Sequence, residues 1–256
     1  MNYKPIFSIA KTTYKEGIRN KIFYNILFFG LLIICSSIVF NKMTVGDETK
    51  IIKDLGLSCI SLFGLLTILL LGTNHIYQEF EERIIYSVLA KPISRGDYLL
   101  GKYFGILFII VIEIVSMFIL TVVLLFAIRG IVYWILLKGL YTIFLELALL
   151  CAIAILFSSF MRPQLSIITI LAVYIIGHST SELRILMAGK GSYFGTKMFE
   201  VVYYLFPNFD NFDITPQVVH NLQLVPFHLT LVSLYAVFYT TLVLIISTQI
   251  FKRKEF

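Results

Sequence analysis

Charged residues are scarce in this chain of 256 residues. Asp, Glu, Lys and Arg together make up 14% of it, whereas apolar residues make up 59%. A soluble globular domain carries about 25% charged residues, so a water-soluble fold of this length would lack the polar side chains that cover its surface. The mean hydropathy of +0.90 agrees. This shortage excludes a soluble protein and predicts an integral membrane protein.

Cysteine is also scarce. Cys35, Cys59 and Cys151 each lie in an apolar run and form no CxxC pair, so their spacing predicts neither a disulfide framework nor a zinc site. There is no HExxH motif, and the four histidines are scattered along the chain, so we expect no metal site. The net charge of +6 is spread between apolar runs and forms no dense basic stripe, which argues against nucleic-acid binding.

One stretch comes close to a phosphate-binding loop. Residues 96–103 read Gly-Asp-Tyr-Leu-Leu-Gly-Lys-Tyr, but the motif requires Ser or Thr where Tyr103 stands, to coordinate magnesium, and a strand before the loop. We interpret the stretch as a chance match. We therefore expect no nucleotide or other cofactor on this chain.

Long apolar runs are what the sequence has in abundance. A helix needs about 20 mostly apolar residues to cross the hydrocarbon core of a membrane, and a backbone in lipid must satisfy its own hydrogen bonds, which favours helices. The sequence therefore predicts an all-α, polytopic membrane protein with six transmembrane helices in a single transmembrane domain, residues 1–256. The predicted spans are residues 22–40, 55–77, 103–128, 139–161, 163–181 and 227–251.

The distribution of Lys and Arg predicts how these spans are oriented. An even number of spans places both termini on one side, and thirteen of the 21 Lys and Arg residues fall on that side. Because the side richer in these residues faces the cytoplasm, we expect a multi-pass protein of the cytoplasmic (inner) membrane with both termini cytoplasmic. The thirteen are Lys4, Lys11, Lys15, Arg19, Lys21, Arg83, Lys91, Arg95, Lys102, Arg162, Lys252, Arg253 and Lys254.

Residues 3–19 show helical periodicity before the first span. Their apolar and basic side chains fall on two adjacent arcs at about 100° per residue. Such a helix is expected to lie in the membrane surface, with its apolar side down and its basic side toward anionic headgroups. It is either an ordinary anchor before the first span or an elbow helix that also touches a cytoplasmic partner.

The longest cytoplasmic segment, residues 78–102, has a pattern of helix, break and helix. Residues 79–90 favour a short helix with acidic residues at its start, and Pro92 cannot continue it. Ser94, followed three residues later by Asp97, predicts a cap for a second helix that runs into the third span. The pattern is typical of a lever that contacts another protein. The residues expected to make this contact are Glu79, Phe80, Glu81, Glu82, Arg83, Ile84, Leu89, Lys91, Pro92 and Arg95.

The longest segment on the opposite side comprises residues 182–226. Residues 196–206 favour a helix with Phe199, Val202, Tyr203 and Phe206 on one face. Side chains of this kind suit the lipid interface. The pattern leaves open whether residues 194–206 re-enter the membrane or form a simple structured loop.

Two acidic residues lie inside predicted spans. Glu113 is in the third span and Glu146 in the fourth. An ionisable side chain inside a membrane is costly to keep there, so each is a candidate functional residue. Alternatively, each acid has a structural role and hydrogen-bonds a neighbouring helix.

Small side chains predict close contact between helices. Gly101 and Gly105 stand four residues apart at the start of the third span, and Ser58, Ser61 and Gly64 recur in the second.

Several stretches together resemble the membrane subunits of type-2 ABC exporters. More narrowly, they are similar to the permease class that includes the nitrous-oxide-reductase maturation and gliding-motility permeases. The matching stretches are residues 9–21, 82–102, 206–213 and 251–256, of which Leu89-Ala90-Lys91-Pro92-Ile93-Ser94-Arg95 is the most specific. Where the family usually has Gly-Thr after the Glu-Arg pair, this chain has Ile84-Ile85-Tyr86.

The resemblance implies a function. Two copies of such a subunit pair with two cytoplasmic ATPase subunits, and the short loop helix docks into a groove on each ATPase, so that ATP-driven closure reaches the spans. It therefore implies a non-catalytic permease, with ATP and Mg held by the partner ATPase. We expect as partners that ATPase, a second copy of this chain or a related permease, and the lipid membrane, but no nucleic acid. These residues identify neither the substrate nor whether the work is export, mechanical or assembly.

Two other classes of function stay open at this point. One is a membrane scaffold that recruits a cytoplasmic complex through the same loop. The other is a membrane-embedded enzyme that uses Glu113 or Glu146. A substrate-dependent change in a partner's ATP hydrolysis would favour transport over the scaffold. Activity of the isolated chain that is lost in Glu113→Gln or Glu146→Gln would favour the enzyme.

Overall fold

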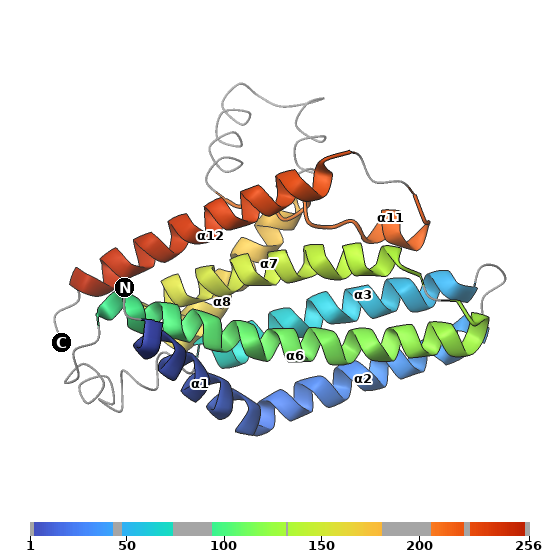
Figure 1. Cartoon of the computed structure of the whole chain (residues 1–256), viewed down its shortest axis with the longest axis horizontal. Coiled ribbons are helices and arrows are strands. Elements are labelled where there is room, and N and C mark those ends of the chain that lie inside the picture. The colour runs from blue at the N-terminus through green and yellow to red at the C-terminus, as the bar shows by residue number, and fades with distance from the viewer. Residues whose placement is uncertain are drawn as a thin grey trace.

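The computed structural model of the chain describes residues 3–42, 48–73, 94–131, 133–180, 206–222 and 226–253. Within these ranges every regular element is a helix, so the all-α fold class is confirmed. In chain order the elements are α1 (Tyr3–Arg19), α2 (Lys21–Lys42), α3 (Glu48–Thr67) continued by a π-helix η1 (Ile68–Gly72), α6 (Arg95–Arg129), α7 (Ile135–Ser158), α8 (Pro163–His178), α11 (Thr215–Val219) and α12 (His228–Arg253) (Figure 1).

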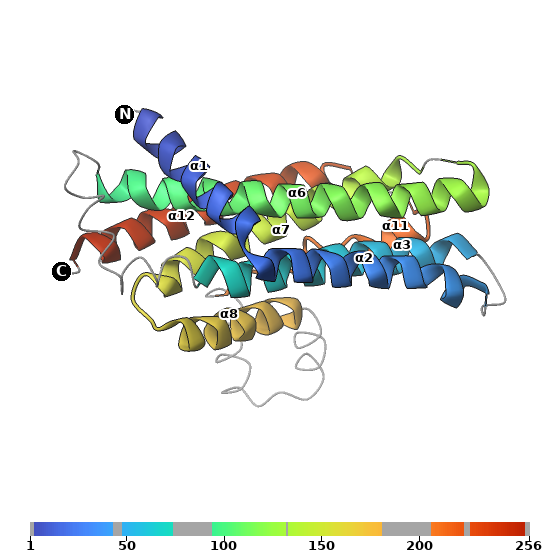
Figure 2. The same cartoon turned by 90° about the horizontal axis from the view of Figure 1, so that it is seen from below.

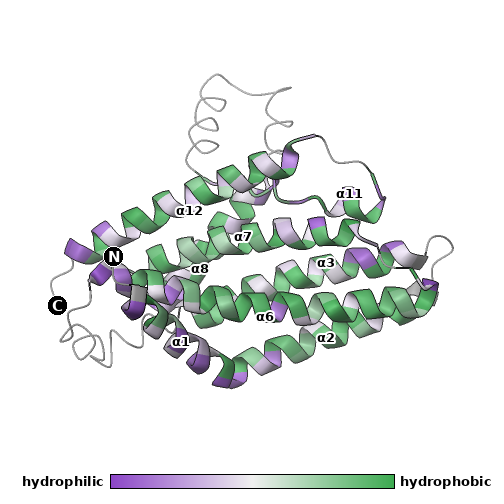
Figure 3. Ribbon diagram, viewed as in Figure 1, coloured by the Kyte–Doolittle hydropathy of each residue, from purple (hydrophilic) through white to green (hydrophobic). Residues whose placement is uncertain are grey.

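Five helices in the described ranges are long and apolar enough to cross a membrane: α2, α3 with η1, α6, α7 and α12. Figure 3 shows apolar residues along the length of these helices. α8 is apolar but has only 16 residues, or about 24 Å, which is less than the hydrocarbon core of about 30 Å. A shorter helix therefore stands where a full span over residues 163–181 was predicted. The chain is a polytopic membrane protein.

Local sequence sets both ends of α6, the longest helix. Ser94 is its N-cap, and the Ser94 Oγ accepts a hydrogen bond from the Asp97 backbone N–H at 3.1 Å, which confirms the predicted cap. At the other end Gly130 adopts a left-handed φ of +66° and donates to the Phe126 carbonyl at 2.7 Å, a conformation that glycine reaches without strain. α6 begins at Arg95, before the predicted span of residues 103–128. Its 35 residues extend over about 50 Å, which is longer than the hydrocarbon core.

α1 crosses the first part of α6 in close contact (Figures 1 and 2). Two glycines allow this approach, because an added Cβ would lie 2.7 Å from the Ile9 Cβ at Gly101 and 2.6 Å from the Thr13 Cβ at Gly105. The close contact predicted at this glycine pair is confirmed. Ala10 and Thr13 are buried, so one face of α1 packs on α6, whereas the apolar side of this helix was predicted to face the membrane.

α7 is the central helix of the bundle. It contacts α3, α6, α8, α11 and α12. α8 and α12 run along only part of its length, and α11 packs on α3 and α7 along the rest (Figures 1 and 2). The start of α6 and the end of α12 lie at one end of the bundle, near the N-terminus (Figure 1). Which side of the membrane this end faces stays a prediction.

Candidate functional site

A buried acidic side chain of α7 is paired with a histidine of α8. The Glu146 Oε1 lies 2.8 Å from the His178 Nε2, and the Glu146 side chain is 3% exposed. A carboxyl that loses its water needs such a partner, because an unpaired buried polar group is costly. The sequence left open whether Glu146 is a functional residue or an acid that hydrogen-bonds a neighbouring helix. The structure shows the hydrogen bond to a neighbouring helix.

His178 also faces a third part of the chain. Its Nδ1 lies 3.8 Å from the Asp210 Oδ1, in the stretch of residues 206–214. The imidazole ring packs against Tyr174, with ring centroids 4.5 Å apart, and against Phe209, with centroids 5.7 Å apart. Each ring nitrogen therefore faces a carboxylate, and the two aromatic rings hold the orientation of the imidazole.

A close backbone approach places Asp210 beside α8. The Phe209 N–H donates to the Gly177 carbonyl at 3.1 Å, and a Cβ on Gly177 would overlap the Phe209 ring. The Asn208 side-chain oxygen accepts from the Asp210 N–H at 3.1 Å, and the Asn208 N–H donates to the Tyr235 hydroxyl at 3.0 Å. These bonds join residues 206–214 to both α8 and α12.

The Glu146–His178 pair lines a polar cavity of about 240 Å³ between α3, α7, α8 and residues 206–215. A second cavity of about 430 Å³ lies next to it and also reaches Lys50, Asp54 and His220. The two cavities share polar lining residues between the start of α3 and the buried Glu146. The residues that line both cavities include Ser58, Asp213 and Thr215.

Both nitrogens of the His178 ring face acidic side chains and not a serine. A serine nucleophile needs a base that is placed to accept its proton, but His178 presents Nε2 to Glu146 and Nδ1 to Asp210. Ser58 and Ser61 line the same cavity. Among the residues that the structure describes, no group of three His, Cys, Asp or Glu side chains is arranged to hold a metal ion.

A family model described as ABC-2 family transporter protein matches residues 7–256. The chain belongs to the ABC-2 transporter family. It is therefore a permease component of an ABC transporter and a multi-pass membrane protein. No curated protein matches the chain. The narrower similarity to the nitrous-oxide-reductase maturation and gliding-motility permeases stays a prediction.

Most of the residues predicted to contact the ATPase lie outside the described part of the permease. The exception is Arg95, in the first turn of α6. Its Nη1 donates to the carbonyl oxygens of Phe251 at 3.0 Å and Lys252 at 3.1 Å, in the last turn of α12. The nine predicted contact residues outside the described ranges are Glu79, Phe80, Glu81, Glu82, Arg83, Ile84, Leu89, Lys91 and Pro92.

The contact of Arg95 with α12 has a simple physical cause. The last carbonyls of a helix have no partner within the helix, and a cation is favourable at that end of the helix dipole. Tyr98, one turn further along α6, stacks on the buried Phe251 ring with centroids 6.0 Å apart. Arg95 and Tyr98 therefore join the start of α6 to the end of α12, and a contact between Arg95 and the ATPase stays a prediction.

The second intramembrane acid, Glu113, is in a different setting. It is 1% exposed, and neither of its carboxyl oxygens has a hydrogen-bond partner. Thr67 of α3 is close enough to interact with it, but the Thr67 hydroxyl is also without a hydrogen bond. Directly after Thr67 the helix changes to the π-helix η1. Glu113 is absent from the cavity lined by Glu146, so the structure does not join the two acids in one site.

Three residues of this site were not predicted from the sequence. His178 was treated as one of four scattered histidines, and Asp210 and Asp213 entered only through the family resemblance. A usable signal was present, because Glu146 and His178 both stand in predicted spans and a buried acid needs a partner. The predicted helix at residues 196–206 lies outside the described residues, apart from Phe206.

Proposed function

We propose that this permease is the membrane-spanning subunit of an ABC exporter, in which ATP hydrolysis on a separate subunit moves a substrate across the cytoplasmic membrane. Two copies of the chain pair with two ATPase subunits, which bind the ATP and Mg, and the chain itself binds no cofactor. Both termini and residues 78–102 face the cytoplasm, and residues 182–226 face outside. Family membership supports the permease role, and the distribution of Lys and Arg supports the orientation.

The observation that carries this proposal is the anchoring of the first turns of α6. Residues 74–93 connect η1 to α6. α6 is bonded to the end of α12 through Arg95 and packs on α1 at Gly101 and Gly105. A displacement of the preceding loop therefore acts on a helix that is joined to two others. A lever between an ATPase and the membrane helices requires such a connection.

The experiment tests the loop by two kinds of variant in the complex with the ATPase that co-purifies in mild detergent. Phe80→Ala and Arg83→Glu should weaken ATPase binding at least tenfold, because aromatic and Arg anchors usually dominate an interface. Lys91→Gly and Pro92→Gly should keep the ATPase bound but uncouple its hydrolysis from the permease, because glycine makes the backbone between the ATPase contact and α6 more flexible. Lys138→Glu, an exposed change at the start of α7, is the control and should leave both quantities unchanged.

Three outcomes are decisive. If all four loop variants keep wild-type binding and hydrolysis, the loop is a connector and the proposal is wrong. If the ATPase binds through the loop but its hydrolysis never depends on the permease, the chain is a scaffold. If the isolated chain has an activity that Glu146→Gln abolishes, it is an enzyme.

A further inference from the structure

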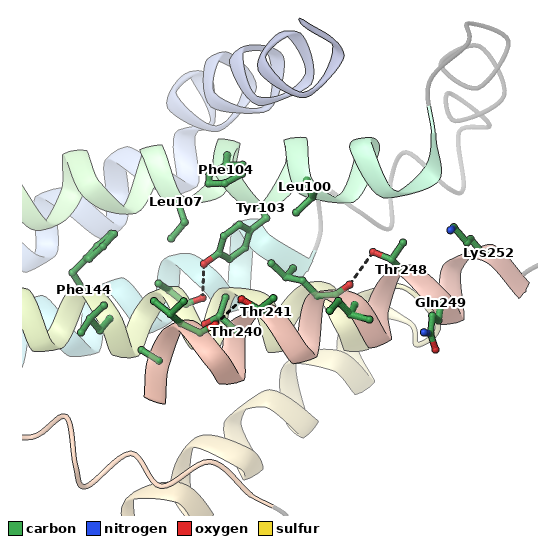
Figure 4. Close-up of a pocket in the computed structure, with 16 residues that line it drawn as sticks. Leu100, Tyr103, Phe104, Leu107, Phe144, Thr240, Thr241, Thr248, Gln249 and Lys252 are labelled. Atoms are coloured by element: carbon green, nitrogen blue, oxygen red, sulfur yellow. Dashed lines mark hydrogen bonds between the residues drawn. The ribbon is translucent and has the colours of Figure 1, made fainter. Parts of the chain in front are cut away.

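A long groove lies between α6, α7 and α12 (Figure 4). Its volume is about 780 Å³. The walls are mostly apolar, with Leu107 of α6, Phe144 of α7 and Leu244 of α12 among them, and Lys252 and Gln249 lie at one end. Figure 4 shows these two side chains at the end of the groove near the start of α6.

Of the four hydroxyl groups that line the groove, three donate to backbone carbonyls, and the fourth, on Thr240, lies beside the Tyr103 hydroxyl. The Tyr103 hydroxyl donates to the Ala148 carbonyl at 3.3 Å. Thr241 and Thr248 each donate to the carbonyl four residues earlier in α12, at 2.6 and 2.8 Å. Because these donors are already used by the backbone, the groove offers a hydrocarbon chain an apolar surface along its middle.

The dimensions of the groove fit one leaflet of a membrane. The α12 residues that line it run from Ala236 to Lys252, a distance of about 24 Å at 1.5 Å per residue. Half of the hydrocarbon core measures about 15 Å, and the headgroup layer of one leaflet adds about 6 Å. A lipid whose tail follows α12 therefore brings its headgroup to the level of Lys252.

The charge at that end selects the headgroup. No Asp or Glu is among the residues that line the groove, while Lys252 lines it and Arg253 follows on the exposed end of α12. Arg95 holds the Phe251 and Lys252 carbonyls, which fixes the helix end that carries the Lys252 side chain. Basic sites between transmembrane helices bind anionic lipid headgroups in this way.

We propose that the groove binds an anionic phospholipid. One acyl chain lies between α6 and α12 over Phe144, and the headgroup phosphate contacts Lys252 and Gln249. The lipid fills the groove between α6 and α12, so it supports the spacing of these two helices. The site does not depend on the ATPase, and the proposed function contributes only the expectation that this leaflet is the cytoplasmic one.

The test is native mass spectrometry of the purified full chain after exposure to equal amounts of phosphatidylglycerol and phosphatidylcholine. The wild-type chain should retain phosphatidylglycerol preferentially. Lys252→Ala should lower that preference about fivefold, since one basic residue near an anionic surface contributes about 1 kcal/mol, and Lys252→Glu should abolish it. Val237→Trp, which puts a large ring on an exposed groove position, should reduce retention of both lipids.

Lys4→Glu is the matched control, because Lys4 is exposed, lies on α1 near the same end of the bundle and is absent from the groove. It should leave the preference unchanged. Three results would overturn the proposal: equal retention of the two lipids by the wild-type chain, equal losses in Lys4→Glu and Lys252→Glu, or a loss of dimer rather than of lipid in Val237→Trp. The last result would mean that a second copy of the chain covers the groove.

Discussion

The Nε2 atom of His178 lies 2.8 Å from the Oε1 atom of Glu146 and thereby joins α8 to the central helix α7. His178→Ala should destabilise the protein by about 2–4 kcal/mol, because it leaves a buried carboxyl without its partner. The free energy of unfolding in mixed micelles with increasing SDS is the measurement. Replacing both residues, in Glu146→Leu with His178→Leu, should recover most of the loss, since an apolar pair needs no partner. A double variant as unstable as His178→Ala would show that the pair is not what the substitution disturbs.

Glu113 and Glu146 should respond differently to the same substitution. Glu113→Gln replaces a buried carboxyl that has no hydrogen-bond partner with a neutral amide of nearly the same shape, so we expect the free energy of unfolding to stay within about 0.5 kcal/mol of the wild type or to rise. Glu146→Gln replaces the acid that faces His178 and should cost about 1–2 kcal/mol. The same SDS titration measures both. Equal losses in the two variants would contradict the difference between the two sites.

Gly177 should tolerate no side chain. Gly177→Ala pushes a methyl group into the Phe209 ring and should displace residues 206–214 from α8, with a loss of about 1–3 kcal/mol for the overpacked contact. Gly72→Ala is the control, because the nearest atom to its added Cβ lies 3.7 Å away. The SDS titration again gives the free energy. Comparable stability of the two variants would mean that the segment is not held at Gly177.

Arg95 should protect the end of α12. Arg95→Ala leaves the carbonyls of Phe251 and Lys252 without the guanidinium that they accept from, so the last helical turn should fray. Trypsin cleaves after Lys and Arg, and its cleavage at residues 252–254 should become at least threefold faster. Arg129→Ala, at the opposite end of α6, should not change this rate. An unchanged rate in Arg95→Ala would show that other contacts hold the helix end.

The orientation of the permease can be tested by labelling with an impermeant thiol reagent. In a chain without Cys35, Cys59 and Cys151, a cysteine placed at Lys190 should react from outside intact cells, and one at Lys91 should react only after the cytoplasmic side is opened. The expectation follows from the excess of Lys and Arg on the side of the termini. Labelling at position 190 from the cytoplasmic side alone would reverse the orientation.

Composition and run length determined the class of this protein, because an unbroken apolar run of about 20 residues can satisfy its own backbone hydrogen bonds in hydrocarbon as a helix. Short-range rules also predicted the Ser94 cap, since the two bonded groups stand three residues apart. The spacing of Gly101 and Gly105 likewise predicted that another helix approaches closely there, and this helix is α1. The span boundaries differ from the predicted ones. α3 begins at Glu48 and α6 at Arg95, not at residues 55 and 103, because a helix continues beyond the apolar run wherever caps and packing allow.

Only the tertiary structure decided which polar groups meet. Glu146 and His178 are 32 residues apart, and Arg95 and Phe251 are 156 residues apart. Apolar periodicity determines which face of a helix is buried but not which neighbour covers it, so Glu146 with a partner and Glu113 without one looked alike in the sequence. The difference comes from the end of α8, which places the His178 Nε2 beside the Glu146 carboxyl, and from residues 206–214, which place Asp210 beside the other nitrogen of that ring.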